Sequence, residues 1–483
     1  MRARPAKLSR GQDGQQKMAV QQVIGLDIGT SRIKFVEAHV GRRGPVITAA
    51  GIGLTPRDTI SNGVIVDPDT LGAAVRQLLD QHGVKTKAVI SSVASQSSLV
   101  VRPIEVPRMT RQELAQTMQF EVERHIPFAA SEVVMDFQPM VAPEQLPAEA
   151  QNMDVLLAVA QEDMINAYLQ TIEVAGLRPL ALDIEPLAAA RALIDITAEQ
   201  SNAYQETIAQ VNVGATATDI TIIKEGLLAF TRTIPLAGDS LTNAISEGLG
   251  RDVNEAERLK REFGTLLVEG AIPAMPAPAP AAPPTSALQT PEMPGLGDLD
   301  ATQVLTTPEE AQPEPAEADK PVFDLSSEIE DTRPPRQPAR QIFDLSAEEA
   351  EGTAAETAPE PEAAPVMPVP VGPSLEGDSM ARKVYEAMMP ALTELVGEIR
   401  RSIDYYRTRY PNSTVDRVLL FGGTARLEHF GEFLSNELAI PVVVGDPFAN
   451  MSFLPPGYSE RYLKEIACLF PIAVGLGLRE MME

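Results

Sequence analysis

Three short glycine-containing turns have residue types that could bind phosphate, and each stands at the end of an apolar run. They are residues 25–30 (GLDIGT), 212–216 (NVGAT) and 422–425 (GGTA). Small side chains let backbone N–H groups approach phosphate oxygens, and successive exposed amides form an anion-binding nest. Each turn alone is typical of an ordinary hairpin. Their order along the chain is therefore more informative than any one of them.

Other arrangements that carry chemistry are missing from the sequence. There is no Gly-x4-Gly-Lys-Ser/Thr stretch, which excludes a P-loop protein. The histidines, His39, His82, His125 and His429, show no metal-ligand spacing. The single cysteine, Cys468, lies in an apolar stretch and cannot form an intramolecular disulfide. We therefore expect a reducing compartment and no metal cage built from histidine and cysteine.

The net charge limits the classes of molecule that the protein is expected to bind. The 483 residues include 67 acidic and 40 basic ones, a formal net charge of −27. Such a polyanion is repelled by nucleic acid and by anionic lipid, so we expect protein partners and no nucleic acid. The longest apolar run, residues 468–478, is too short to cross a bilayer, and residues 1–22 lack the apolar core of a signal peptide. These features predict a cytoplasmic protein.

Two segments are predicted to be disordered. Residues 271–380 hold 21 of the 41 prolines, and their 21 acidic residues face only four basic ones. A tract of this composition cannot bury enough apolar surface to offset its chain entropy, so residues 265–380 read as a disordered insertion. Residues 1–20 form a basic tail, in which Met18 is an alternative start. Two ordered blocks, about 20–264 and 381–483, remain.

The insertion contains a repeated motif, Phe-Asp-Leu-Ser-x-Glu, at residues 323–328 and 343–348. Each copy brings two bulky apolar residues into a tract that otherwise has few. Two weak sites on one flexible tether gain avidity, so we interpret the repeat as a duplicated docking motif. A duplication without function is the alternative. The anchors would be Phe323, Leu325, Phe343 and Leu345.

The ordered blocks alternate strands and helices, which indicates an α/β fold. Residues 22–29 and 32–40 are predicted to pair as a hairpin, and residues 210–234 repeat the same strand, turn, strand pattern. A capping box at Thr110 and Glu113 predicts the start of a helix. The long helix after residue 381 has apolar residues at spacings of three and four. Other strands are expected at 46–53, 88–93, 97–105 and 415–423, and helices at 110–125, 162–175 and 427–438.

The three turns resemble, in this order, the phosphate 1, phosphate 2 and adenosine motifs of the actin-like ATPase superfamily. The resemblance implies a two-lobed, ribonuclease H-like duplicated fold that holds ATP and Mg2+ between its lobes. Asp27 matches the residue that organises the magnesium waters, and Gly29, Thr30 and Ser31 match the phosphate clamp. Lys34 matches the lysine that reaches the phosphates; a solvent-facing strand residue is the alternative.

Further positions follow from the same resemblance. Glu185 matches the residue that orients the attacking water; its alternative role is a charge favoured at a helix N-terminus. Asn212 stands where the superfamily has aspartate, and an amide cannot supply the negative charge or accept a proton as readily. We therefore expect ATP binding with weak or absent hydrolysis. The remaining nucleotide-binding positions are Gly214, Ala215, Thr216, Glu257, Lys260, Arg261, Gly422, Gly423 and Thr424.

A more specific resemblance is to the PilM family of type IV pilus assembly proteins, a branch related to FtsA. It is carried by stretches such as VIGLDIGTSRIKFVEA, LDIEPLAAARAL and VDRVLLFGGTARLEHF, and by residues 121–128 (EVERHIPF), which nucleotide binding does not explain. The family implies a groove that holds the cytoplasmic N-terminal tail of the membrane protein PilN. The predicted contact residues are Glu121, Ile126, Pro127 and Phe128.

The resemblance also implies a domain plan and a cellular role. The first lobe would comprise residues 21–96 and 183–209, the second residues 210–264 and 381–483, and an extra FtsA-type subdomain residues 97–182. The protein would be attached to the inner membrane only through PilN, and would connect it to the motor ATPases or the platform protein in pilus assembly and twitching motility. Whether the protein forms a homo-oligomer is left open by the resemblance.

Three alternatives are weighed against this interpretation. An FtsA-like division scaffold shares the subdomain, but FtsA proteins end in an amphipathic membrane helix, whereas residues 471–483 here resemble core. A small-molecule kinase of the same fold would need a base and a substrate loop that are not identifiable. A nucleotide-independent scaffold is favoured by Asn212 alone.

Overall fold

The computed structural model describes residues 22–41, 44–94, 98–126, 128–195, 205–266, 375–411, 413–449 and 458–482. The predicted tail, Met18 and both Phe-Asp-Leu-Ser repeats lie outside these residues. The predicted insertion, 265–380, also lies outside them except at its two ends. There the prediction is wrong, because Leu266 is buried and donates its N–H to the carbonyl of Glu428, and helix α7 already begins at Leu375.

The first five-stranded sheet is built on an antiparallel meander that two parallel strands extend. Its strand order is β10-β6-β1-β2-β3. Every residue of β1 and β6 is buried, as expected of near-continuous apolar strands that are covered on both faces. The strands are β1 (Val23–Ile28), β2 (Arg32–Gly41), β3 (Gly44–Leu54), β6 (Ala88–Val93) and β10 (Arg178–Ile184).

The second five-stranded sheet repeats this topology. Its order is β13-β12-β11-β14-β15, with β11 antiparallel to β12 and parallel to β14, just as β1 is antiparallel to β2 and parallel to β6. The predicted duplication of the hairpin therefore extends to a whole sheet. The strands are β11 (Thr207–Val213), β12 (Thr218–Lys224), β13 (Leu227–Ile234), β14 (Arg417–Phe421) and β15 (Val442–Val444).

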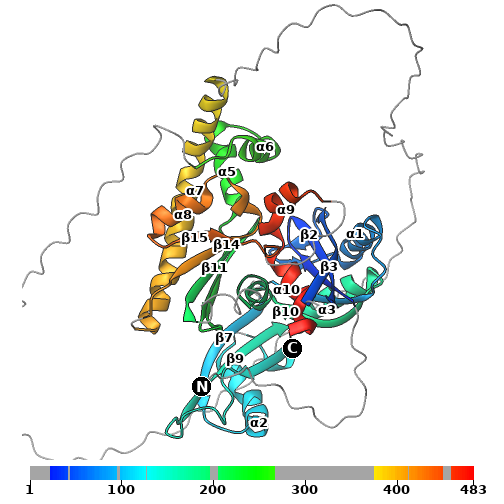
Figure 1. Cartoon of the computed structure of the whole chain (residues 1–483), viewed down its shortest axis with the longest axis vertical. Helices are drawn as coiled ribbons and strands as arrows, with labels where there is room; N and C mark the ends of the chain where they lie inside the picture. The colour runs from blue at the N-terminus through cyan, green and yellow to red at the C-terminus, as the bar shows by residue number, and fades with distance from the viewer. Residues whose placement is uncertain are drawn as a thin grey trace, which may run out of the picture. The chain divides into compact units, whose positions relative to one another are not determined.

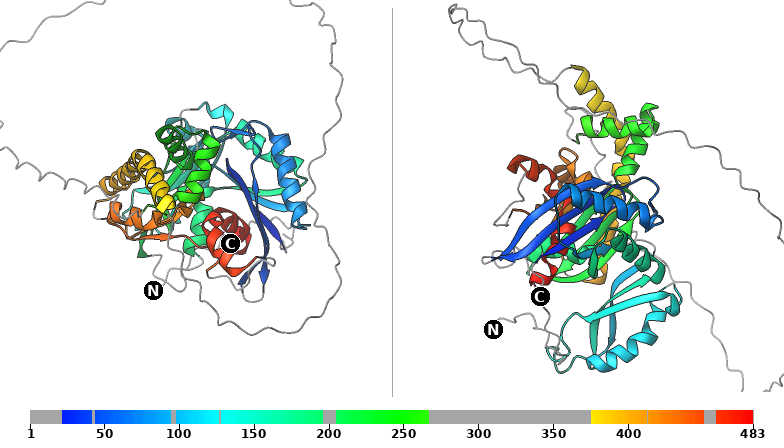
Figure 2. Two further views of the ribbon diagram at one scale, coloured as in Figure 1. Left: turned by 90° about the horizontal axis from the view of Figure 1, so that it is seen from above. Right: turned by 90° about the vertical axis from the view of Figure 1, so that its right-hand side faces the viewer.

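Helices cover both faces of the first sheet, and Figure 2 shows α1 (Pro68–Gln81) and α10 (Pro471–Met482) on opposite sides of it. The apolar run at residues 468–478 is buried throughout. It reaches the sheet and the short helix α4 (Glu185–Ala190) through glycines that leave no room for a side chain. A Cβ at Gly25 would lie 2.1 Å from the Ala473 carbonyl oxygen, and one at Gly475 would lie 1.7 Å from that of Ala188.

The second sheet carries the longest helix of the described residues, α7 (Leu375–Arg409), which Figure 1 shows in yellow. All of its predicted core positions are buried, which confirms the periodicity of this segment. These positions are Val384, Met388, Leu392, Leu395, Ile399, Ile403 and Tyr406. The other helices of this half are α5 (Gly238–Leu249), α6 (Val253–Phe263), α8 (Phe430–Leu438) and α9 (Glu460–Ile466).

A third, three-stranded sheet has the order β7-β9-β8 and a small core of its own with helix α2 (Arg111–Glu121). The predicted capping box is present: Thr110 Oγ1 accepts from the Glu113 N–H at 3.3 Å, and the Glu113 carboxylate accepts from the Thr110 N–H at 2.8 Å. The strands are β7 (Leu99–Pro107), β8 (Val133–Pro139) and β9 (Asn152–Gln161).

Two predicted domain boundaries are wrong. The subdomain was expected to run to residue 182, but β10 pairs with β6 in the first sheet, and α3 (Glu162–Val174) packs on α1, where Gly72 leaves room for Val174. The first lobe was expected to include residues up to 209, but β11 begins the second sheet at Thr207. In the described part of the chain, no helix is both long and apolar enough to span a bilayer.

The contact between α10 and α4 gives a testable prediction. Gly475→Ala should destabilise the protein by about 3 kcal/mol despite the better helix propensity of alanine, because its Cβ would overlap the Ala188 carbonyl and force the backbone apart. Gly431→Ala in α8 is the control, since its Cβ meets nothing closer than 3.5 Å. Urea unfolding measures both; equal stability of the two variants would contradict the packing described here.

Candidate functional site

One cavity of about 320 Å³ opens between the two five-stranded sheets and is lined from both. The structure brings together at this cavity all the residues that the sequence predicted for nucleotide binding and catalysis. These are Asp27, Gly29, Thr30, Ser31, Lys34, Glu185, Asn212, Gly214, Ala215, Thr216, Glu257, Lys260, Arg261, Gly422, Gly423 and Thr424.

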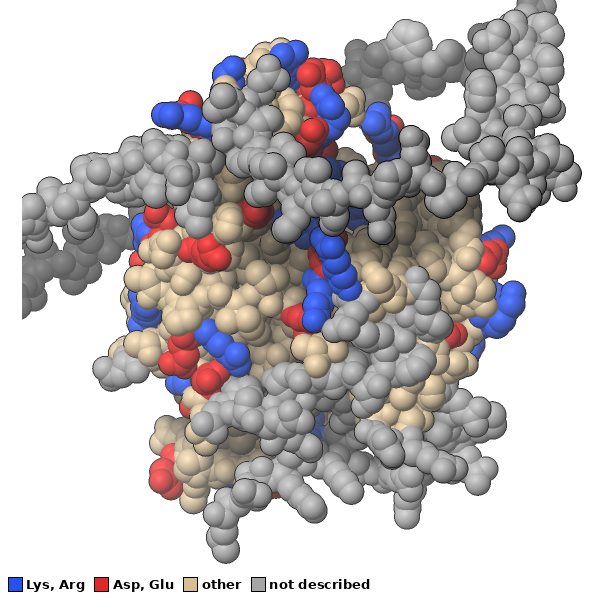
Figure 3. All heavy atoms as spheres, turned by 45° about the horizontal axis from the view of Figure 1, so that its top comes forward, with Lys and Arg blue, Asp and Glu red and all other residues tan. Residues whose placement is uncertain are grey.

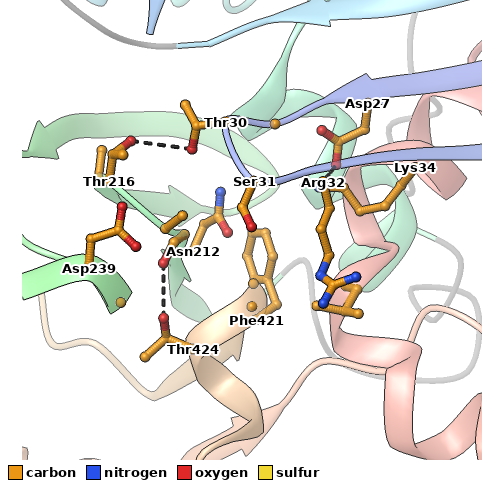
Figure 4. A pocket seen from close by; sticks show the side chains of 18 of the residues that line it. Asp27, Thr30, Ser31, Arg32, Lys34, Asn212, Thr216, Asp239, Phe421 and Thr424 are labelled. Carbon is orange, nitrogen blue, oxygen red and sulfur yellow. Dashed lines mark hydrogen bonds and ion pairs between the residues drawn. The ribbon is translucent and has the colours of Figure 1, made fainter. Parts of the chain in front are cut away.

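The two hairpin turns face each other across the cavity. Thr30 Oγ1 and Thr216 Oγ1 lie 3.4 Å apart, as Figure 4 shows. Each turn is closed by its own backbone bond: the Gly29 N–H donates to the Arg32 carbonyl at 3.1 Å, and the Gly214 N–H donates to that of Ala217 at 3.0 Å. Two rigid, mostly small-residue turns therefore present their tips to one space.

The third turn is fastened to the second. Gly422 has φ of +96°, and a Cβ there would lie 2.5 Å from both Asn212 Oδ1 and the Val213 carbonyl oxygen, so only glycine allows this approach. Thr424 Oγ1 donates to the Gly214 carbonyl at 2.9 Å. The same carbonyl accepts the N–H of Gly238, the first residue of α5, at 3.2 Å. This network fixes the second turn, the third turn and α5 to one another.

A buried ion pair lies at the base of the first hairpin. Asp27 is 2% exposed, and its Oδ2 lies 2.7 Å from Lys34 Nζ. The two residues are direct cross-strand partners in the pairing of β1 with β2. The lysine therefore neutralises the aspartate, and Lys34 is already paired before any ligand arrives.

Asp219 is a cavity residue that the sequence analysis missed. It is the cross-strand partner of Asn212 in the second hairpin, exactly as Lys34 is the partner of Asp27 in the first. Asn212 Nδ2 donates to Asp219 Oδ2 at 3.4 Å, and Thr233 Oγ1 donates to Oδ1 at 2.6 Å. The equal spacing of seven residues in both hairpins was the signal that could have found it.

Two carboxyl groups in this part of the cavity have raised pKa values. Burial, followed by the charges of Asp219 and Asp27, raises the pKa of Glu185 well above its ordinary value. Burial raises the pKa of Asp219 to about 6, although Thr233 and Asn212 donate hydrogen bonds to it. Hard oxygen groups that repel one another suit a bound cation or a shared proton.

The donor set fits Mg2+ held largely through water. In the described residues, no three Asp, Glu, His or Cys side chains lie close enough to hold a metal by themselves. Mg2+ commonly uses one or two carboxylates, several waters and the phosphates of a nucleotide. Asp27, Asp219 and Glu185 lie at this cavity with that chemistry.

The helix α6 contributes residues whose polar groups are already engaged. Lys260 Nζ donates to the Gly238 carbonyl at 2.8 Å and to Thr242 Oγ1 at 2.7 Å, and it pairs with Glu257 Oε2 at 2.6 Å. Glu257 Oε1 accepts from Arg261 Nε at 2.7 Å. Burial acts to raise the pKa of Glu257, but the hydrogen bonds from Lys260, Thr242 and Arg261 outweigh it and lower that pKa. Lys260 therefore fastens α6 to α5.

Of the residues predicted for partner binding, Glu121, Ile126 and Phe128 lie on the third sheet's unit and do not line the cavity. Glu121 pairs with Arg124 at 3.2 Å, Ile126 packs against the small core, and Phe128 is half-buried. Pro127 lies outside the described residues. Beside them the structure exposes Phe120, 75% accessible, which the sequence analysis missed because it lies off the apolar stripe of α2.

Two duplicated sheets around a cavity lined by two phosphate-type hairpins and a third glycine turn define an actin-like ATPase fold. The model of the type IV pilus assembly protein PilM matches residues 25–266, and the chain belongs to this family. The model of the cell division protein FtsA matches residues 209–460.

Individual relatives agree with the FtsA match. FtsA of Bacillus subtilis is 23% identical over 262 residues, covering 50% of this chain and 58% of that protein; FtsA of Streptococcus pneumoniae is 24% identical over 299 residues, covering 58% and 61%. The chain thus spans less than two thirds of these relatives. A solved PilM-PilN type IV pilus biogenesis complex superposes with a TM-score of 0.65 at 21% identity, covering 96% of this chain and 99% of that one, which shows the fold.

The raised pKa of Asp219 gives a prediction with a definite sign. The protonated form is favoured in the fold, so stability is lost as pH rises from 3.8 through about 6. Asp219→Asn removes this loss. The variant should be about 3 kcal/mol more stable than the parent at pH 7, and the gain should vanish below pH 3.8.

Urea unfolding between pH 3.5 and 7.5, without nucleotide or metal, measures this effect. Asp163→Asn, at an exposed position in α3, is the control and should leave the pH profile unchanged. A gain for Asp219→Asn that does not depend on pH would contradict the electrostatic explanation.

Proposed function

We propose that this protein is an ATP-binding, actin-like component of the type IV pilus inner-membrane platform that binds the cytoplasmic tail of PilN. ATP binding is supported above all by the convergence of two glycine turns in a chain of the PilM family. Thr30 Oγ1 and Thr216 Oγ1, at the tips of these turns, lie 3.4 Å apart.

The nucleotide would lie across the cavity. Its phosphates would accept hydrogen bonds from the amides of residues 30–31 and 215–216, and its nucleoside would face α6 and the turn at 422–424. Mg2+ would neutralise the phosphate charge. Asp27 and Asp219 would hold its waters, and Glu185, whose pKa is raised, would orient a water near the terminal phosphate.

Hydrolysis would be slow. Asn212 occupies the position at the end of β11 where the superfamily has aspartate, and its amide is a poor proton acceptor. Asp219 lies across the hairpin and supplies a negative charge near Asn212, so the substitution at 212 does not leave the second hairpin without a carboxylate. We therefore infer that cation binding is retained while turnover is weak.

The PilN tail would bind beside the third sheet. A solved relative is a PilM-PilN complex, and the unit that carries Glu121, Ile126 and Phe128 also exposes Phe120 on α2. Exposed aromatic residues are frequent anchors in peptide interfaces. Through PilN the protein would lie at the cytoplasmic side of the inner membrane and connect the pilus platform to its motor.

A second candidate function is an FtsA-like division scaffold. It is favoured by the FtsA match over residues 209–460 and by the curated relatives, which are FtsA proteins. The two candidates share the nucleotide site, so the peptide partner is what distinguishes them.

The proposed nucleotide site predicts saturable binding of Mg-ATP, with one site per chain, and a steady ATP turnover below about 1 per second. Isothermal titration calorimetry measures the binding, and phosphate release measures the turnover. Turnover at or above the ordinary enzyme range would contradict the weak-ATPase proposal, and the absence of any nucleotide binding would favour the nucleotide-independent scaffold.

The partner part predicts that a peptide of the same organism's PilN N-terminal tail binds the Mg-ATP form at micromolar concentration or tighter, about −8 kcal/mol. Phe120→Ser should weaken this binding at least roughly tenfold, because the peptide would lose an aromatic anchor that it covers on binding. Val443→Ser, which changes an exposed apolar residue on β15, is the control and should have no effect. No detectable heat with the parent protein would move the division-scaffold candidate ahead.

A further inference from the structure

The cavity is lined by five basic side chains, and four of them already have carboxylate partners. Lys34 lies 2.7 Å from Asp27, and Arg426 lies 3.0 Å from Glu465. Lys260 and Arg261 both pair with Glu257, at 2.6 and 2.7 Å. The fifth is Arg32. Figure 3 shows Lys and Arg side chains gathered near the middle of the face that it draws.

Arg32 differs from the other four because its guanidinium has no hydrogen-bond or ion-pair partner within the described ranges of the chain. It is also half-buried. Burial, followed by the like charges of Arg261 and Arg426, lowers its pKa, and the opposite effects of Tyr462 and Glu257 are smaller. A charge withdrawn from water beside two like charges costs folding free energy unless an anion compensates it.

The position of Arg32 suits a ligand at the first hairpin turn. It is the first residue of β2, directly after the turn at residues 29–31, and it lies on the same face of the strand as Lys34, two residues on. Figure 4 shows the Lys34 side chain beside Asp27 and the Arg32 side chain extending away from that pair into the cavity.

We propose that Arg32 recognises the phosphate chain of a bound nucleoside di- or triphosphate, and that Lys34 instead holds the Asp27 carboxylate in place through their ion pair. This inference rests on the proposed nucleotide site. The planar guanidinium can bind two phosphate oxygens at once. The fold thus keeps an uncompensated cation that its ligand neutralises.

The experiment compares Arg32→Met, which keeps an unbranched, mostly apolar stem without the charge, with Arg32→Lys, which keeps the charge. Arg258→Met is the matched control, because Arg258 lies on α6, pairs with Glu262 at 3.8 Å, is 68% exposed and does not line the cavity. Each protein is titrated with ADP, AMP and adenosine, and its thermal midpoint is measured without ligand.

Arg32→Met should lower ADP affinity roughly ten- to hundredfold, the usual loss for a hydrogen bond to a charged group, and should leave adenosine affinity unchanged. Its thermal midpoint without ligand should rise by about 2 to 4 °C, because the uncompensated charge is gone. Arg32→Lys should recover part of the ADP affinity, and Arg258→Met should match the parent in every measurement.

Unchanged ADP affinity in Arg32→Met would overturn the assignment. So would an equal loss for ADP and adenosine together with a lower thermal midpoint, since that pattern belongs to a structural role. If the parent protein itself binds neither ADP nor adenosine, the proposed nucleotide site fails, and this outcome is distinct from a failure of the Arg32 assignment alone.

Discussion

The carbonyl oxygen of Gly214 is the point on which the site depends. It accepts the N–H of Gly238 at 3.2 Å and the hydroxyl of Thr424 at 2.9 Å, so one atom of the second hairpin turn holds both the start of α5 and the third glycine turn. The close approach of Gly422 to Asn212 and Val213 requires the absence of a side chain there. Segments separated by about two hundred residues are thereby fixed around one space, and any ligand of that space contacts elements from both sheets.

The two sheets repeat one backbone design but differ in the charges that it carries. At equivalent positions the first hairpin pairs Asp27 with Lys34, whereas the second pairs Asn212 with Asp219. The first pair is neutral as a whole, and the second has a net negative charge once Asp219 ionises. This asymmetry places the charges of Asp219 and Asp27 near Glu185, and a cation would relieve that repulsion. Arg32, which has no partner among the described residues, gives the same cavity a group that an anion would neutralise. A magnesium-bound polyphosphate would supply both: its cation would offset the carboxylates, and its phosphates would offset Arg32.

Much of this architecture could be predicted from the sequence, because local patterns determine it. Continuous apolar runs predicted β1 and β6, the spacing of three and four predicted the buried face of α7, and Thr110 with Glu113 predicted the start of α2. Tertiary pairing could not be predicted in this way. The assignment of β10 to the first sheet, which moves the subdomain boundary, depends on a parallel partner about ninety residues earlier. The engagement of Lys260 and the isolation of Arg32 depend on which acceptors the fold brings near, and the sequence alone does not contain that information.

The measurement that tests the central claim most directly is a crystal structure of the protein with Mg2+ and a non-hydrolysable ATP analogue. The account predicts that the phosphates lie beside Thr30 and Thr216, against the amides of residues 30–31 and 215–216, with the nucleoside beside α6 and the turn at 422–424. An analogue bound outside this cavity, or a cavity still empty at millimolar analogue, would contradict it.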